Sequence, residues 1–137
     1  MIQISREDLL LALKRFKGIA KQDLLPHNLD PHSDYWKTHA EARRETYAKL
    51  IELVEGEGIE KACVFAYSEY QNLPVISSSN DNPAVKGHLQ ALEMFFNVVG
   101  IAIDMIRKMI EEHKELSQLI HFTPQFQEDY SSSNLVV

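Results

Sequence analysis

The sequence is poor in the residues that build disulfides, cysteine-based metal sites and phosphate-binding loops. Its 137 residues include one cysteine, Cys63, which excludes an intrachain disulfide framework and a zinc site made of cysteines. They include five glycines and neither a Gly-x-Gly-x-x-Gly nor a Walker-type pattern, so no glycine loop is available to cradle a nucleotide. A lone cysteine in an apolar run is typical of an inert core thiol, and we expect a cytoplasmic protein.

Long apolar runs are also missing. The most apolar window, residues 91–110, is interrupted by Glu93, Asn97, Gly100, Asp104, Arg107 and Lys108. A bilayer span does not tolerate so many polar groups, and the first residues do not have the pattern of a secretory signal. The window therefore predicts a core helix and no membrane segment.

Basic residues are outnumbered, with 14 Lys and Arg against 20 Asp and Glu, which gives a net charge of −6. An acidic chain is a poor ligand for nucleic acid and for anionic membranes, so we expect neither partner. The charge is uneven, because residues 1–21 hold five basic and two acidic side chains. The length is that of one domain, which we place at residues 1–122, followed by a loosely ordered tail at 123–137.

Helical spacing of apolar residues runs through most of the chain. Ser5, with Asp8 three residues later, resembles a capping box that opens a helix over residues 5–22. Asp30 and Pro31 predict the start of a second helix, which ends at Gly56-Glu57-Gly58. A third helix is expected over residues 59–73. The pattern predicts an all-α, four-helix bundle-like domain.

The fourth helix is expected to be long and central, covering residues 83–120 from Pro83 to about Ile120. Asn82 precedes Pro83 as a helix cap, and two apolar stripes follow, one of them made of Met94, Val98, Ile101, Met105 and Met109. Because a small monomer needs to bury one stripe, we expect a homodimer through this helix. Gly100 inside the stripes predicts close approach of another backbone at that point.

Metal ligands on a helix need partners at three- or four-residue spacing, which His39, His88 and His113 do not have. We therefore expect no metal and no cofactor.

A second group of residues has the composition of a recognition surface. Trp36, His39 and Arg43 fall within two turns of one helix face, and Arg44 adjoins them. They form our candidate binding site for an acidic partner or a stacked base. In the competing interpretation, which we favour, Trp36 fills the core and the Arg43 stem covers it.

Arg107 and His113 are separated by five residues, a spacing similar to the Arg-x(4–6)-His motif of the HEPN family of all-helical ribonucleases. That resemblance implies RNA cleavage within a dimer, with Arg107 stabilising the phosphate and His113 acting as acid or base. The competing interpretation is an exposed helix end whose two cations balance Glu111, Glu112 and Glu115. The sequence therefore favours a non-enzymatic interaction or regulatory protein with an unknown protein partner, and a HEPN-like ribonuclease is the alternative.

Overall fold

The computed structural model describes residues 3–25, 33–73 and 81–115. Within these ranges the chain forms helices and no strand, which confirms the all-α prediction. The helices are α1 Arg6–Gln22, α2 Ser33–Glu57, α3 Ile59–Gln71, α4 Pro83–Val99 and α5 Ile103–Glu111. The Asp30–Pro31 start signal and the tail at 123–137 lie outside the described residues.

Local capping explains where two of these helices begin. The Ser5 side chain accepts a hydrogen bond from the Asp8 backbone N–H at 3.0 Å, as the capping pattern predicts. The Asn82 side chain accepts from the N–H groups of Ala84 and Val85, directly before Pro83. Both caps satisfy amide groups that have no acceptor inside the helix.

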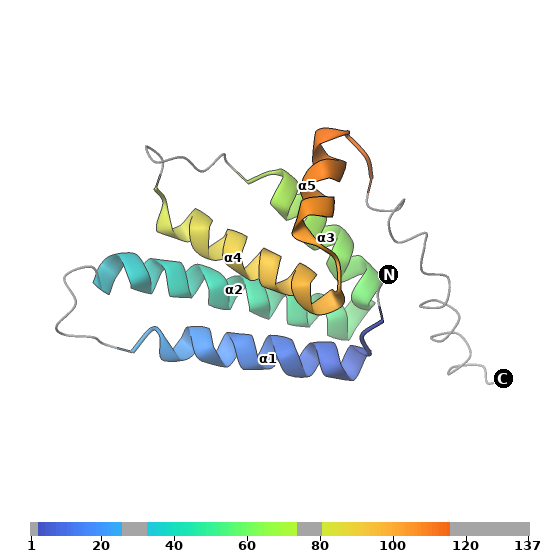
Figure 1. Cartoon of the computed structure of the whole chain (residues 1–137). Helices are drawn as coiled ribbons and strands as arrows, with labels where there is room; N and C mark the ends of the chain where they lie inside the picture. Colours follow the sequence, from blue (N-terminus) through green and yellow to red (C-terminus); the bar gives the residue numbers. More distant parts are fainter. Residues whose placement is uncertain (1–2, 26–32, 74–80, 116–137) are drawn as a thin grey trace.

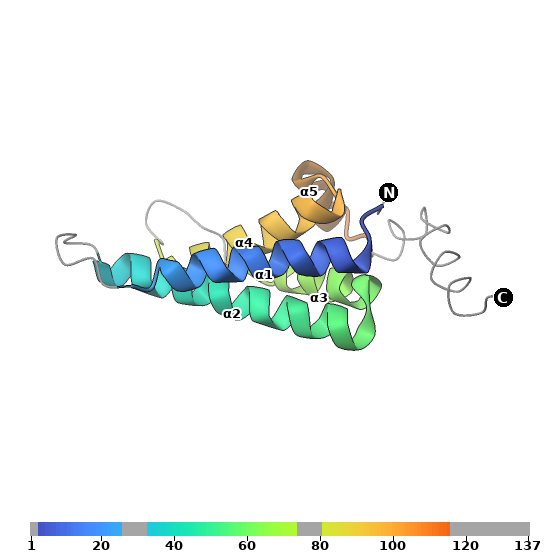
Figure 2. The ribbon, with the colours of Figure 1, turned by 90° about the horizontal axis from the view of Figure 1, so that it is seen from below.

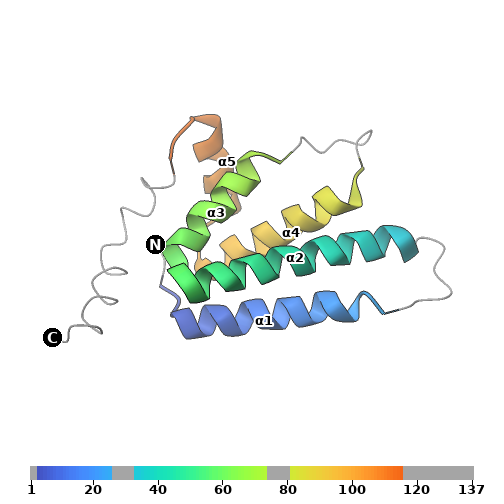
Figure 3. The same cartoon turned by 180° about the vertical axis from the view of Figure 1, so that it is seen from behind.

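The central helix is α2, not the predicted helix over 83–120. α1 and α4 both run along α2, and α3 turns back from its end and lies at an angle to it (Figures 1 and 3). α1 is antiparallel to α2, because Lys14 pairs with Glu55 while Asp23, near the other end of α1, pairs with Arg43. The core between these helices is made of buried side chains from all five, among them Leu9, Leu13, Leu50, Val54, Cys63, Leu92, Phe95, Phe96 and Ile106.

The predicted long helix is wrong because the chain turns at Gly100. Gly100 ends α4 with a left-handed backbone, φ +88°, and its N–H and that of Ile101 donate to the last carbonyls of the helix. The axes of α4 and α5 differ by 111°. This turn swings Ile106 and Met109 onto the core, so one chain buries apolar residues that a straight helix would leave for a partner.

The close backbone approach expected at Gly100 occurs at Gly87 instead. Gly100 is exposed, whereas Gly87 is buried and lies close to the His39 carbonyl of α2. A Cβ built on Gly87 would collide with that oxygen and lie 3.1 Å from the Ala42 Cβ. The missing side chain thus allows α2 and α4 to touch.

No single described helix has the length and hydropathy of a membrane span, and α4 and α5 reach those values only when taken together across their bend.

Candidate functional site

Trp36 lies in the first turns of α2, and its side chain is 51% exposed. The interpretation of Trp36 as a core residue is therefore wrong. The reason is the length of α1: Asp23, just past its end, meets Arg43, which lies two turns after Trp36 on α2. No residue of α1 is left to cover the indole. Its ring instead makes edge contacts with Tyr35 and His39, at centroid distances of 5.0 and 5.5 Å.

His39 is buried beneath this indole and is held by Arg43. The Arg43 Nε donates to the His39 Nδ1 at 3.2 Å, which puts the imidazole proton on Nε2 and leaves the ring neutral. Burial first, and then the nearby Arg43 charge, lower the pKa of His39 below its usual 6.5. Arg43 in turn donates through Nη2 to Asp23 at 2.7 Å. We call Tyr35, Trp36, His39 and Arg43 the Trp36 surface.

Two residues that sequence reasoning missed attach this surface to α4. The Tyr35 hydroxyl donates to Asp81 at 2.7 Å, and Lys86 pairs with the same carboxylate at 2.9 Å. The hydrogen bonds from Lys86 and Tyr35 lower the pKa of Asp81. Nothing in the sequence marks this contact, because Tyr35 and Asp81 are 46 residues apart.

Arg44 does not join Trp36, His39 and Arg43. The next position on a helix points about 100° away, so Arg44 lies on the flank of α2 that carries Glu55. Its Nε is buried and has no hydrogen-bond partner among the described residues. An unpaired buried donor costs about 1–3 kcal/mol, more when it is charged, so Arg44 carries a local cost to the stability of the fold.

A partly buried polar chain links α2, α4 and α3. The Thr46 hydroxyl contacts the His88 Nδ1, and the His88 Nε2 contacts Glu69 at 3.0 Å. The order of hydroxyl, imidazole and carboxylate resembles that of a nucleophile relay. However, Thr46 is only 5% exposed and its hydroxyl also lies 2.8 Å from the Ala42 carbonyl, so a substrate cannot reach it. We interpret the chain as a structural connection between three helices.

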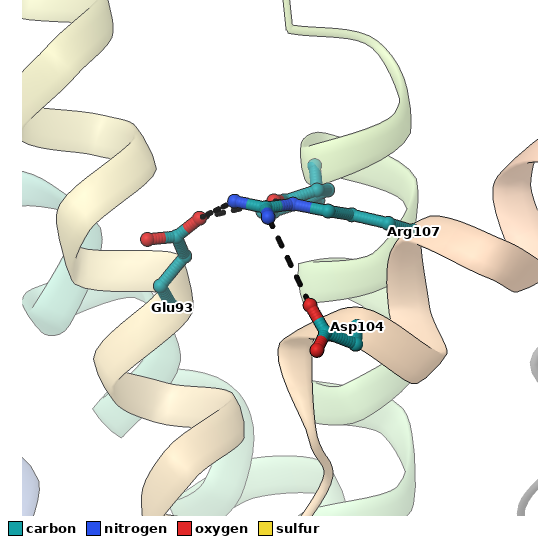
Figure 4. A network of polar contacts seen from close by, with 4 residues as sticks. Glu93, Asp104 and Arg107 are labelled. Atoms are coloured by element: carbon teal, nitrogen blue, oxygen red, sulfur yellow. Dashed lines mark hydrogen bonds and ion pairs between the residues drawn. The ribbon is translucent and has the colours of Figure 1, made fainter.

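Arg107 and His113 are not brought together as a catalytic pair. The Arg107 side chain is exposed and pairs with Glu93 at 3.4 Å and with Asp104 at 3.9 Å (Figure 4). Its Nε also donates to the Tyr70 hydroxyl at 3.2 Å. His113 lies after the end of α5, exposed, with φ +56°. Within the described residues no hydrogen bond or ion pair joins the two side chains. A phosphate at Arg107 would have to displace two carboxylates.

The remaining reactive groups are buried or dispersed. Cys63 is fully buried, and burial raises the pKa of its thiol to about 12, as expected of an inert core residue. Over residues 3–25, 33–73 and 81–115, no three His, Cys, Asp or Glu side chains gather as a metal site requires. Comparison with known proteins adds nothing to this geometry: no protein-family model, no curated protein and no solved structure matches the chain.

Proposed function

We propose that this chain is a non-enzymatic interaction protein that binds a partner protein through the Trp36 surface. The observation that carries the proposal is a tryptophan left 51% exposed while its neighbours hold it in place. Trp, Tyr and Arg supply most of the binding energy at protein interfaces, and three of the four residues of this surface are of these types.

The contacts of these side chains favour binding because they reduce its entropic cost. Tyr35 and His39 restrain the indole from two sides, and Asp23 and His39 fix Arg43. Ordering a free side chain on binding costs about 0.5–1.5 kcal/mol. A surface whose rings and guanidinium are already ordered avoids much of that cost.

The non-enzymatic part of the proposal is supported by the surroundings of the side chains that could take part in catalysis. Thr46 is buried, Arg107 is paired with carboxylates, and the neutral His39 lies beneath the indole. No specific observation favours the ribonuclease alternative over this proposal.

The test is affinity isolation from the producing cells with wild type, Trp36→Ala and Val64→Ala. Val64 is a matched control, since it is a half-exposed apolar residue on α3. We expect one partner to be recovered with wild type and Val64→Ala and lost with Trp36→Ala, whose stability should change by less than about 1 kcal/mol. Because Trp36 is the only tryptophan, its emission should shift to the blue when the purified partner is added. Equal recovery with Trp36→Ala, or unfolding of that variant, contradicts the proposal.

We also propose that the chain self-associates through α4 and α5. The apolar surface available for this contact is smaller than the sequence predicts. Of the second apolar stripe, one chain buries Ile101 and Met109, partly covers Met94 and Val98, and leaves Met105 exposed. Sedimentation at micromolar concentration, with Met105→Glu beside wild type, is the test. A dimer that dissociates in the variant supports this contact, whereas a monomer in both proteins eliminates it.

A further inference from the structure

α1 presents apolar residues on the side that faces away from the core. Leu11 is 61% exposed and Ile19 is 47% exposed, and both lie on the outer face of α1, which we define as Leu11, Arg15, Gly18 and Ile19. Arg15 lies four residues after Leu11, and Gly18 and Ile19 lie three and four residues after Arg15, so these positions share one side of the helix. Figure 2 shows α1 in front of α2 and α4, with no other described helix lying over it in that view.

Gly18 on this face has no structural explanation among the described residues. It is the thirteenth of the 17 residues of α1, and glycine is less favourable than alanine in a helix interior. Gly87 makes room for a carbonyl and Gly100 takes a left-handed conformation, but a Cβ at Gly18 would have nothing within 4 Å and its φ is ordinary. None of the described residues occupies the space that this missing side chain leaves, so a backbone from outside the described part of the chain can approach α1 closely at Gly18.

Cations line one side of this face. Lys14, Lys17 and Lys21 follow one another at spacings of three and four along α1, and Lys14 pairs with Glu55 of α2. Lys17 and Lys21 have no carboxylate partner among the described residues.

Arg44 of α2 extends this row of cations. It lies three helical turns before Glu55 and therefore on the same flank of α2, and the Asp23–Arg43 pair puts it beside the last turn of α1. We call Lys14, Lys17, Lys21 and Arg44 the basic flank.

From this arrangement we propose that the outer face of α1 docks an acidic amphipathic helix of another protein. The backbone of that helix crosses at Gly18, its apolar side chains contact Leu11 and Ile19, and its carboxylates pair with the basic flank. A basic flank on a chain of net charge −6 selects an acidic ligand. The surface is distinct from the Trp36 surface and does not depend on it.

A second copy of the chain and a membrane fit this face less well. Two α1 helices packed about a two-fold axis at Gly18 would oppose Arg15 and the basic flank with the same cations. A helix lying in a membrane interface buries a wide apolar face, whereas the wide apolar face of α1, with Leu9 and Leu13, is buried in the core.

The probe for the test is a fluorescein-labelled synthetic helical peptide with alanine and leucine on one face and glutamate on both flanks. A second peptide carries lysine in place of every glutamate. Fluorescence anisotropy measures binding to wild type, Gly18→Leu and the double variant Lys17→Glu/Lys21→Glu. The matched control is Lys61→Glu/Lys108→Glu, which reverses two exposed cations that lie on α3 and α5, away from α1.

We expect the acidic peptide to bind wild type and the control double variant, and the lysine peptide to bind neither. Gly18→Leu and Lys17→Glu/Lys21→Glu should each weaken binding at least about tenfold, and raised salt should weaken it in wild type. Circular dichroism should show that both variants stay folded, because a side chain at position 18 meets only open space. Trp36→Ala should bind the peptide as wild type does, which separates this surface from the one proposed above.

Four results would overturn the proposal. They are no binding of the acidic peptide, equal binding of the lysine peptide, unchanged affinity in Gly18→Leu, and self-association that Gly18→Leu abolishes. Binding to vesicles containing phosphatidylserine that Lys17→Glu/Lys21→Glu abolishes, without binding of the peptide, would assign the face to a membrane instead.

Discussion

Gly87→Ala is the substitution for which the structure predicts the largest effect from the smallest change. The added methyl group would collide with the His39 carbonyl oxygen and lie 3.1 Å from both the His39 carbonyl carbon and the Ala42 Cβ. These are backbone and first side-chain atoms of a helix, so they cannot rotate away as the end of a long side chain could. α2 and α4 would have to separate over their whole line of contact, which includes the Thr46–His88 hydrogen bond.

The expected magnitude follows from two opposing terms. Overpacking a close contact typically costs about 1–3 kcal/mol, and replacing a helical glycine by alanine returns about 1 kcal/mol. Gly18→Ala is the matched control, since it makes the same chemical change in a helix with open space around it. Gly18→Ala should therefore gain stability and Gly87→Ala should be less stable than Gly18→Ala by the overpacking cost of about 1–3 kcal/mol, because the gain from replacing glycine is common to both.

Urea unfolding followed by far-UV circular dichroism measures this difference. The midpoint should move to lower urea for Gly87→Ala and to higher urea for Gly18→Ala, with the slope unchanged in both. If Gly87→Ala is as stable as Gly18→Ala, the close contact between α2 and α4 does not exist as described.

Three further predictions concern a cap, a titration and an activity. Ser5→Ala removes the side-chain oxygen that accepts from the Asp8 N–H and should lower the free energy of unfolding by about 1 kcal/mol, measured by urea unfolding; no change would mean that the cap is not formed. Because burial lowers the pKa of His39 below 6.5, the unfolded chain takes up a proton where the folded chain does not, so stability should be constant above about pH 6.5 and fall as the pH drops below it. Thermal unfolding between pH 7.5 and 5 checks this, and the fall in this window should be smaller in His39→Gln, whereas equal slopes in both proteins would contradict the assignment. Finally, the purified protein should cleave no RNA; cleavage that disappears in both Arg107→Ala and His113→Ala, with folding intact, would replace our proposal with the ribonuclease alternative.

Several features of the fold depend on neighbours in the sequence and could be predicted from it. The Ser5 and Asn82 caps, the breaker glycine Gly58 after α2 and the all-helical character involve groups within about four residues of each other. Cys63 was expected in the core because the apolar residues around it share one helical spacing, and the structure buries it. For the candidate site, the sequence correctly grouped Trp36, His39 and Arg43, since residues three and four apart in a helix lie on one face.

The tertiary structure decided what those local rules leave open. Gly100 is compatible with a helix interior and with a left-handed cap, and the cap is favoured here because a turn lets one chain bury Ile106 and Met109 on the core. Trp36 is exposed because α1 ends before it can cover the indole, which depends on how α1 and α2 are aligned. The tight contact at Gly87 joins residues 48 positions apart in the sequence. The sequence by itself thus determined which segments are helical and which side of each is apolar, and only packing between distant segments determined where the chain turns and which large side chains remain exposed.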